Sequence, residues 1–307
     1  MKVCVIGSYA KALVMTADRI PVVGETLTGY DFRQTFGGKG SDMAVQAARL
    51  GAQVGYIGVV GDDMYGSEFF DLMQSEGIRT SGIRKAAERP TGIGFIIKDK
   101  AAHNVIVVDK GANDLFCETD IDRNIQLIRE ADVVLAQLEI SAKTALYALK
   151  KAKELGKTTI LNPAPAIDLS GYDLGFVDII TPNETEAGII TGKGSEGKTY
   201  EEIAKDVLKT GCGNVVMTLG DKGAFIFNSR ETYHVKPYKI DVVDSNGAGD
   251  SFNASLASAL AGNKTLGEAV HYANAVAALC CTKWETIPSY HYKDQVQEFM
   301  DTHKEGA

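Results

Sequence analysis

The sequence predicts an α/β protein with a doubly wound, mostly parallel sheet flanked by helices, and with a small β-sheet lid. Short β-rich runs alternate with amphipathic helical stretches along most of the chain, as in parallel strands joined by helical crossovers. Two segments, at about 11–36 and 89–110, instead alternate apolar and polar residues without helices between them. The sequence shows no linker or internal repeat, so we expect a single domain over residues 1–307.

The elements of the first half follow this alternation. A buried strand is predicted first, then an amphipathic helix closed by Gly51, then a second strand, and further strand and helix pairs follow. In chain order these stretches are "KVCVIG", "SDMAVQAARLGA", "VGYIGVVG", "DVVLAQL", "SAKTALYALKKAKELG" and "TTILNPAP".

The second half begins with a core strand and ends in helices. "NVVMTLG" is expected to be the strand, and "AFIFN" with "TYHV" a hairpin. The predicted helices are Ala248–Ala261, Leu266–Cys280 and Lys293–Thr302. The two alternating segments predict one buried and one wet face, as in a small antiparallel sheet outside the main layer. Such a sheet could cover a site as a lid or pair with a second subunit.

Composition and charge exclude some classes of function. The chain has 40 Asp and Glu against 32 Lys and Arg, which argues against a general nucleic-acid binder but not against an anionic nucleotide as ligand. Its five cysteines are scattered without C-x-x-C spacing, as expected of reduced thiols. The start lacks a signal peptide pattern and no apolar run reaches membrane-spanning length. We expect a cytoplasmic protein without nucleic-acid or membrane partners.

One stretch matches a phosphate-binding pattern. "TGKGSEGKTYEE" (Thr191–Glu202) contains G-x-x-x-x-G-K-[ST], the pattern of a P-loop. A working P-loop joins a strand directly to a helix. Here Asn183 and Glu186 are typical of a helix start and Gly192 of its end, while Thr199 begins a capping box for the next helix. We therefore expect these glycines to join two helices and the match to be coincidental.

A better phosphate site is "VDSNGAGDSFNASLASALAG" (Val243–Gly262). Small residues at Gly247, Ala248 and Gly249 let backbone amides approach a ligand, and the helix that follows offers unpaired N–H groups to an anion. The carboxylate of Asp250, in the first turn, could take a proton from a hydroxyl nucleophile. Alone, the pattern equally fits an aspartate that stabilises a helix start.

Several motifs along the chain resemble those of one enzyme family. "GGKGSDMAVQAARLG" and "DSNGAGDSF" are similar to the two signatures of the ribokinase family of PfkB-type carbohydrate kinases. Intermediate motifs of that family occur in the same order, namely "PVVGET", "VGDDMYG", "PTGIGF", "QLE", "NPAPA", "DIITPNETEA" and "MTLGDKGA". The resemblance covers nearly the whole chain.

The resemblance implies ATP-dependent phosphorylation of a primary hydroxyl of a sugar. It implies that Asp250 is the catalytic base and that Gly247, Ala248 and Gly249 form the anion hole. Nucleotide-binding residues would be Asn183, Glu186, Thr218, Gly220 and Asn274. Substrate-binding residues would be Gly38, Lys39, Asp42, Glu139 and Asp250.

The resemblance also implies metal ions and a partner subunit. Glu186 and Asn183 would order Mg²⁺ and phosphate through water, and the metal would neutralise charge on the transferring phosphoryl group. Asp244 would be a ligand of an activating monovalent cation, K⁺. In such dimers the lids pack against each other, so a homodimer through the lid is expected.

The sequence departs from the family in the acceptor pocket. Family members continue the first strand as G-S-x-N-x-D and hold sugar hydroxyls with its Asn and Asp, but this chain has Ala10 and Ala12. A later Asn of the family is Asp42. We therefore expect an acceptor other than plain D-ribose: larger, lacking those hydroxyls, or carrying a base or amine that meets Asp42. Lys11 alternates to the other face, where we expect it to be solvated.

A second departure lies near the C-terminus, where "CCTKWETIPS" places Trp284 and Glu285 in a loop that is usually glycine-rich and supplies carbonyls to the monovalent cation. Activation by K⁺ is therefore open.

Three other functions are compatible with an α/β fold of this kind. A nucleoside kinase of the same fold would be favoured by stacking residues such as Tyr9 or Phe36 in the pocket. A catalytically weak sugar or nucleotide sensor would need neither the retained base nor the metal-ordering element. A nicotinamide dehydrogenase is disfavoured because the first strand lacks the G-x-G-x-x-G turn.

Overall fold

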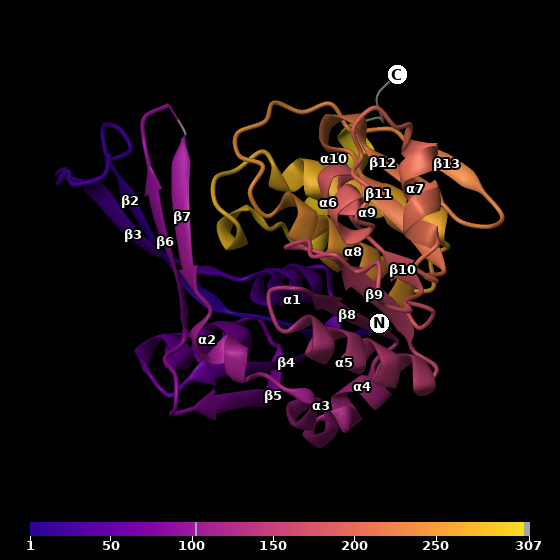
Figure 1. Ribbon diagram of the computed structural model, residues 1–307, viewed down its shortest axis with the longest axis horizontal. Coiled ribbons are helices and arrows are strands. Elements are labelled where there is room, and N and C mark those ends of the chain that lie inside the picture. The colour runs from indigo at the N-terminus through magenta and orange to yellow at the C-terminus, as the bar shows by residue number, and fades with distance from the viewer. Residues whose placement is uncertain (102, 304–307) are drawn as a thin grey trace.

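The computed structural model describes residues 1–101 and 103–303, and its centre is a nine-stranded sheet (Figure 1). The strands lie in the order β13-β12-β11-β10-β9-β8-β1-β4-β5, and all neighbouring pairs are parallel except β11–β12 and β12–β13. Their bounds are β1 Lys2–Ile6, β4 Gln53–Gly61, β5 Arg79–Ala86, β8 Val133–Gln137, β9 Thr158–Asn162, β10 Ile179–Ile180, β11 Asn214–Thr218, β12 Ala224–Phe227 and β13 Thr232–Val235.

Helices cover both faces of this sheet, which confirms the doubly wound fold. Alternation along β1 sends Val3 and Val5 into one hydrophobic core and Cys4 and Ile6 into the other. The first core is closed by α1 Lys39–Arg49, α2 Met64–Ser75, α8 Ala248–Ala261 and α9 Leu266–Cys280. The second is closed by α3 Glu118–Arg123, α4 Ile125–Glu130, α5 Ala142–Glu154, α6 Glu184–Ile190 and α7 Tyr200–Leu208.

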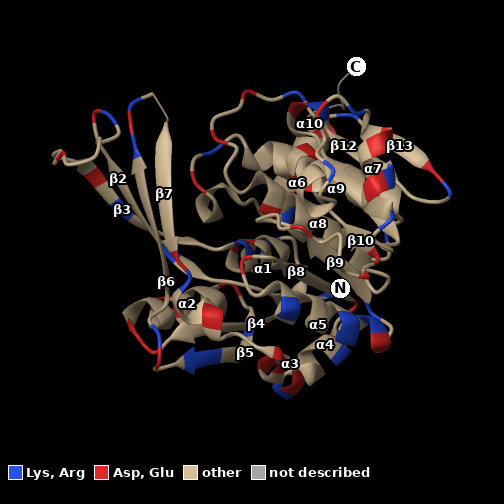
Figure 2. Cartoon of the chain, viewed as in Figure 1, with Lys and Arg blue, Asp and Glu red and all other residues tan. Residues whose placement is uncertain are grey.

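The C-terminal prediction is confirmed closely. Helices α8 and α9 have the predicted bounds, and so does α10, Lys293–Thr302. The predicted hairpin is β12 with β13. None of the helices in the described residues is both long and apolar enough to cross a membrane. In the view of Figure 2, acidic and basic residues intermingle over α3, α4 and α7 rather than gathering into a basic stripe.

The two alternating segments form a separate four-stranded sheet, the lid, which stands at the left of Figure 1. Its strands are β2 Ala10–Thr16, β3 Tyr30–Gly37, β6 Gly92–Lys98 and β7 Asn104–Asp109, in the order β3-β2-β6-β7. The outer pairs are antiparallel, and the central pair β2–β6 is parallel.

The expectation that Lys11 is solvated is wrong. Lys11 does lie on the opposite face of β2 from Ala10 and Ala12, but α2 covers that face at this position and buries Lys11. Its ammonium pairs with Glu68 of α2 at 2.5 Å and lies 4.6 Å from the ring centre of Phe36. Alternation gives the face of a side chain correctly, whereas the helix packed on that face is set by tertiary structure.

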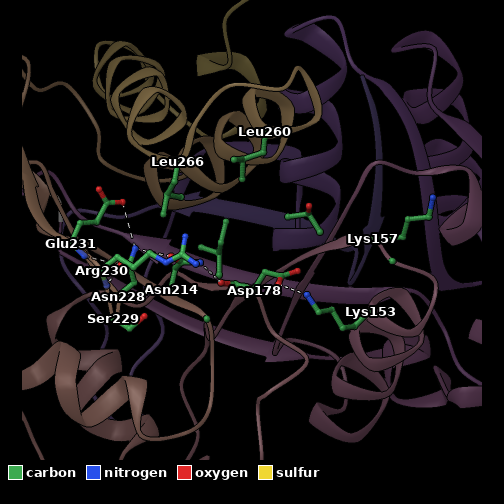
Figure 3. A pocket seen from close by; sticks show the side chains of 14 residues that line it. Lys153, Lys157, Asp178, Asn214, Asn228, Ser229, Arg230, Glu231, Leu260 and Leu266 are labelled. Atoms are coloured by element: carbon green, nitrogen blue, oxygen red, sulfur yellow. Dashed lines mark hydrogen bonds and ion pairs between the residues drawn. The ribbon is translucent and has the colours of Figure 1, made fainter.

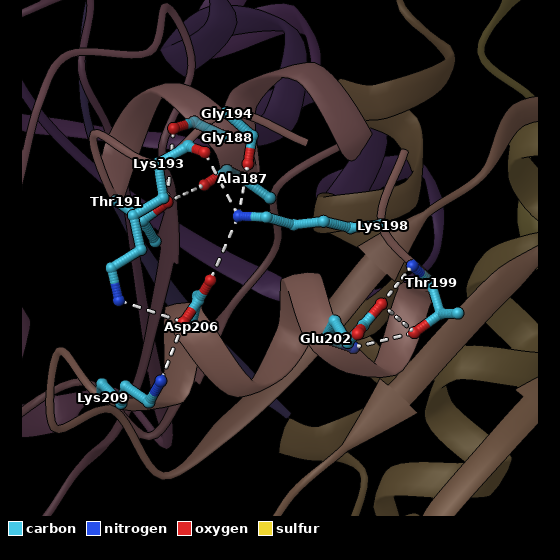
Figure 4. Close-up of polar contacts among 10 residues, drawn as sticks. All are labelled: Ala187, Gly188, Thr191, Lys193, Gly194, Lys198, Thr199, Glu202, Asp206 and Lys209. Atoms are coloured by element: carbon cyan, nitrogen blue, oxygen red, sulfur yellow. Dashed lines mark hydrogen bonds and ion pairs between the residues drawn. The ribbon is translucent and has the colours of Figure 1, made fainter. Parts of the chain in front are cut away.

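The glycine-rich stretch that matches a P-loop joins helix α6 to helix α7, as predicted (Figure 4). The ammonium of Lys198 donates to the carbonyl oxygens of Lys193 and Gly194 and pairs with Asp206 at 3.2 Å. Thr199 caps α7 by accepting from the Glu202 amide. These contacts hold the loop itself together, so Lys198 is not presented to a phosphate.

We expect Lys198→Ala to leave the affinity for ATP unchanged in calorimetric titration, because the ammonium serves its own loop. The same change should lower the free energy of unfolding by no more than about 1 kcal/mol, since the pair with Asp206 is partly solvated. Lys209→Ala, which removes another partner of Asp206, is the matched control. A loss of ATP affinity of about tenfold or more, confined to Lys198→Ala, would contradict this assignment.

Candidate active site

The N-terminus of helix α1 packs directly on the end of strand β1. A Cβ atom on Gly40 would lie 2.6 Å from the backbone nitrogen of Ser8, and one on Gly38 would lie 2.9 Å from the Cα of Tyr9. Gly38 also has a φ of 96°, in a region that side chains disfavour. Glycine at both positions therefore permits the close approach that fixes Lys39, the first residue of the helix.

Glu139 ties this turn to the middle of the sheet. It follows strand β8, which pairs with β1, and its carboxylate accepts hydrogen bonds from the hydroxyl of Ser8 and the backbone amide of Lys39. The amide of Lys39 is one of the unpaired donors at a helix N-terminus, so the carboxylate also suits the helix dipole. Glu139 thus fixes the first turn of α1 at the carboxyl end of the parallel strands.

Asp250 lies in the first turn of helix α8, beside the first turn of α1. The turn is entered through Gly247, whose φ is 78°, and Asp250 is buried. Its Oδ1 lies 3.6 Å from the ammonium of Lys39 and accepts no hydrogen bond within the described residues. Burial raises the pKa of Asp250 to about 6, against the lowering effect of Lys39 and with a further raising effect of Glu139. In turn, Asp250 raises the pKa of Lys39.

Asp42, one turn into α1, is the third buried acid of this cluster. The carboxylate of Asp42 is buried, and its only hydrogen bond in the described chain comes from the hydroxyl of Thr286, at 3.4 Å. Burial raises the pKa of Asp42 well above its ordinary value, and the neighbouring carboxylates Asp250 and Glu139 raise it further. The structure therefore brings Gly38, Lys39, Asp42, Glu139 and Asp250 together, as the sequence predicts.

The predicted nucleotide-binding residues lie mostly at the carboxyl ends of β10 and β11. Asn183 bridges to Thr218, and it caps α6 with Glu186, each accepting the other's backbone amide at 2.8 Å. Gly220, two residues after Thr218, has a φ of 58°, and a Cβ atom placed on it would meet no atom within 4 Å. The side-chain amide of Asn274, by contrast, is used within the protein, where it donates to the carbonyl of Lys236 at 2.8 Å.

The loop that follows α9 and contains Trp284 and Glu285, here called the C-terminal loop, links the lid to the core. Both carboxylate oxygens of Asp244 accept backbone amides, one from Asn246 and one from Glu285. The carboxylate of Glu285 pairs with Arg33 of lid strand β3 at 3.5 Å. The adjacent Trp284 ring lies 6.0 Å from the ammonium of Lys98, on lid strand β6. Neither contact between lid and loop was predicted from the sequence.

Those contacts identify the face of the lid that looks onto the site. Arg33 pairs with Val14 across the strands, and strand alternation places Val14 on the same face of β2 as Ala10 and Ala12. Tyr9 is buried and stacks on Phe69 with ring centres 4.1 Å apart. Phe36 lies opposite Lys11, on the other face of the lid. These two rings therefore offer no support for a nucleoside as acceptor.

Sequence reasoning missed the environment of Gln137. The residue belongs to the motif "QLE", but both polar atoms of its side chain are buried and have no hydrogen-bond partner in the described part of the chain. A Cβ atom on Gly7 would lie 2.2 Å from its Oε1 and 2.8 Å from the Cα of Gly40. Gln137, the last residue of β8, therefore lies close to the first turn of α1, two residues before Glu139.

A separate cleft of about 820 Å³ lies at the opposite edge of the sheet (Figure 3). It is lined at the amino ends of β9, β10 and β11 by Thr158, Ile179 and Asn214, and an ion pair joins Lys153 to Asp178 there. Ligands of open α/β sheets bind at the carboxyl ends of the strands, so we assign the site to the cluster around Asp250.

Comparisons with known proteins identify the family of the chain. Residues 1–292 match the model of the pfkB family carbohydrate kinases. A ribokinase of Haemophilus influenzae is 35% identical over 97% of both chains, and a deoxyribokinase of Salmonella typhi is 32% identical over 98% of this chain and 99% of its own. The structure of an Arabidopsis thaliana ribokinase complexed with ribose and ATP is 30% identical, with a TM-score of 0.86, and the match covers 97% of this chain and 98% of that one.

The family matches extend over nearly the full length of the chain. They agree with the fold of the sheet and the lid, in which Asp250 lies beside Lys39 at two helix N-termini. The chain belongs to the pfkB family of carbohydrate kinases, whose ribokinase members are ATP-dependent sugar kinases.

Proposed function

We propose that this kinase phosphorylates a primary hydroxyl of a sugar other than plain D-ribose, with Asp250 as the general base. The observation that carries the proposal is the buried carboxylate of Asp250, held at the N-terminus of α8 beside the ammonium of Lys39. A carboxylate with a raised pKa is a better proton acceptor than a solvated one, because its conjugate acid is weaker.

The proposed step transfers the γ-phosphoryl group of ATP to the acceptor hydroxyl. Asp250 takes the proton of the acceptor hydroxyl, and the hydroxyl oxygen forms a bond to the γ-phosphorus of ATP. The bond between that phosphorus and the bridging oxygen breaks, and ADP leaves with its electron pair. Lys39, next to Asp250, offsets part of the negative charge that gathers there.

Backbone amides at the start of α8 form the proposed anion hole. The amides of Gly247, Gly249 and Asp250 donate to no acceptor in the described part of the chain, as is usual at a helix N-terminus. The amide of Ala248 makes a long hydrogen bond of 3.3 Å to the carbonyl of Ser245. Such amides suit the charge of a transferring phosphoryl group.

The proposed nucleotide site runs from this hole toward Thr218 and Gly220, with Asn274 near the adenine. Glu186 fits a role in holding Mg²⁺ through water, because only one of its carboxylate oxygens is used to cap α6. When bound, the metal would neutralise phosphate charge.

The alanines at 10 and 12 support an acceptor other than plain D-ribose. Both lie on the lid face that looks onto the site, and neither side chain can hydrogen-bond a sugar hydroxyl. Gly38, Lys39, Asp42 and Glu139 provide the remaining proposed contacts on the core side.

The turnover should rise with pH through about 6, because the base must be ionised to accept a proton and burial raises the pKa of Asp250 to that value. At pH 5 we expect kcat/KM to be about a tenth of its plateau above pH 7. Coupled ADP release is the measurement, made with the best acceptor found. Asp250→Asn should lower kcat by about 10²- to 10⁴-fold and lose the acidic limb. A variant that kept most of its activity would refute the role of Asp250.

The environment of Asp244 is a poor fit to a monovalent cation. Backbone amides of Asn246 and Glu285 occupy both of its oxygens, and the carboxylate of Glu285 is turned to Arg33. We keep Asp244 as the candidate ligand, but we expect only a weak effect of K⁺ on turnover. Replacing potassium chloride with tetramethylammonium chloride at constant ionic strength measures it. A near-complete loss of activity, regained with K⁺, would contradict this expectation.

The outer face of the lid supports a homodimer. Phe95 and Val107 lie directly opposite each other on β6 and β7, with Val105 beside them, and all three side chains are exposed. Exposed apolar patches of this kind mark protein interfaces. We propose that two copies pack through this face.

Val107→Glu should convert the dimer to a monomer, because it places a charge in the apolar patch. Light scattering after gel filtration measures the mass. Val242→Glu, a change at an exposed valine away from the lid, is the control. A wild-type protein that is monomeric at micromolar concentration would refute the proposed dimer.

A further inference from the structure

The cluster of acidic side chains in the candidate active site contains more carboxyl groups than cationic groups. Three carboxyl groups, those of Asp42, Glu139 and Asp250, lie around the ammonium of Lys39, and a fourth, that of Glu186, also acts on its pKa. Lys39 lies 3.6 Å from Asp250, while Glu139 is satisfied by the Ser8 hydroxyl and a backbone amide. Asp42 has no ion pair in the described residues, and the one hydrogen bond of its carboxylate, from Thr286, is 3.4 Å long.

Two other cationic side chains near the lid form ion pairs with residues other than Asp42. Lys11 pairs with Glu68 on the far face of the lid. Arg33 pairs with Asp31 and Glu285. Within the described residues Asp42 has no ion pair. A buried carboxylate without a cation is costly, so the pocket favours either a proton or a positively charged ligand at this position.

A second observation points to a ligand at the same turn of α1. Both polar atoms of Gln137 are buried and have no hydrogen-bond partner in the described residues. The side chain lies against Gly7, which itself packs closely on Gly40 in that turn. Buried amides are almost always hydrogen-bonded in folded proteins, to protein, water or ligand. A polar ligand or its bound water would satisfy this one.

The lid side leaves room for a substituent. Ala12 pairs with Gly94 on β6 and with Thr35 on β3, so small side chains line the face of the lid that looks onto the site. A Cβ atom on Gly94 would meet nothing within 4 Å. Ala12 and Gly94 offer a ligand no hydrogen bond from their side chains, and the hydroxyl of Thr35 is neutral. By contrast, the carboxylate of Asp42 is a charged group of the site without an ion pair in the described residues.

We propose that the acceptor is a sugar that carries a protonated amine, and that Asp42 is the residue that selects it by binding this amine. The inference rests on the proposed function, since it names the class of acceptor for the same site. An ammonium donates a charge-assisted hydrogen bond to a carboxylate and supplies the missing positive charge, whereas a hydroxyl supplies only the hydrogen bond. N-acetylation removes the charge of the amine and should abolish its advantage.

The test compares acceptors that differ only at the amine. The full-length protein is assayed with MgATP on two matched pairs, D-glucosamine against D-glucose and 1-amino-1-deoxy-D-fructose against D-fructose, with N-acetyl-D-glucosamine as the neutral analogue. We expect kcat/KM for the better amine to exceed that of its hydroxyl partner by about ten- to a hundredfold. The ADP produced must be matched by phosphorylated sugar.

Asp42→Asn keeps the shape of the side chain and removes its charge. The preference for the amine should fall by about tenfold or more, mainly through KM, while kcat at saturating acceptor changes little. Asp71→Asn, an equal change of charge at an exposed position on α2, should leave the preference unchanged. Calorimetric titration of the Asp250→Asn protein with each sugar reports binding without turnover.

The outcomes separate this inference from the proposed function. Turnover that prefers the neutral sugars, or an amine preference that survives Asp42→Asn, overturns the inference and leaves the kinase assignment standing. Amine binding to the Asp250→Asn protein without any turnover by the wild type supports the selection by Asp42 and contradicts the proposed function. Absence of both binding and turnover with the amines overturns the inference.

Discussion

The carboxylate of Glu139 holds the site together. By accepting from the Ser8 hydroxyl and the Lys39 amide, it joins the ends of two neighbouring parallel strands to the N-terminus of α1. This contact is possible only because Gly38 and Gly40 let the helix lie against the strand end without a side chain between them. The position of Lys39, and through it the environment of Asp250, follows from this arrangement.

Burial, more than any single charge, sets the chemistry of the cluster. It is the largest influence on the pKa of both Asp42 and Asp250, and it raises both. At Asp250 the ammonium of Lys39 opposes that effect, and the pKa of the carboxyl is raised to about 6. At Asp42 the effect of Lys39 is smaller than that of the neighbouring carboxylates, which add to the effect of burial. The proposals above give these two aspartates different tasks, proton transfer for Asp250 and choice of the acceptor for Asp42.

Much of the fold was predictable because its signals are local. Periodicity and capping gave α8, α9 and α10 with their observed bounds, and a capping box at Thr199 correctly excluded the P-loop. The convergence of Lys39, Glu139 and Asp250 came from the resemblance to a family, since nothing local links positions so far apart in sequence.

Features that depend on tertiary packing escaped prediction. The burial of Lys11 needed knowledge of the helix that covers its face of the lid. The link between Arg33 and Glu285 spans distant parts of the chain that share no periodic signal. Alternation and capping describe a residue within its own element, and they carry no information about the element that packs against it.

The C-terminal loop also gives the protein a built-in optical probe. Trp284 is the only tryptophan of the chain, and it is exposed between the core and the lid, with the ammonium of Lys98 over its ring. A nearby charge shifts the emission of an indole, and so does the exclusion of water from around it. The intrinsic fluorescence of the native protein should therefore respond to any change in the separation of lid and loop, which would make such a change measurable in solution without a label.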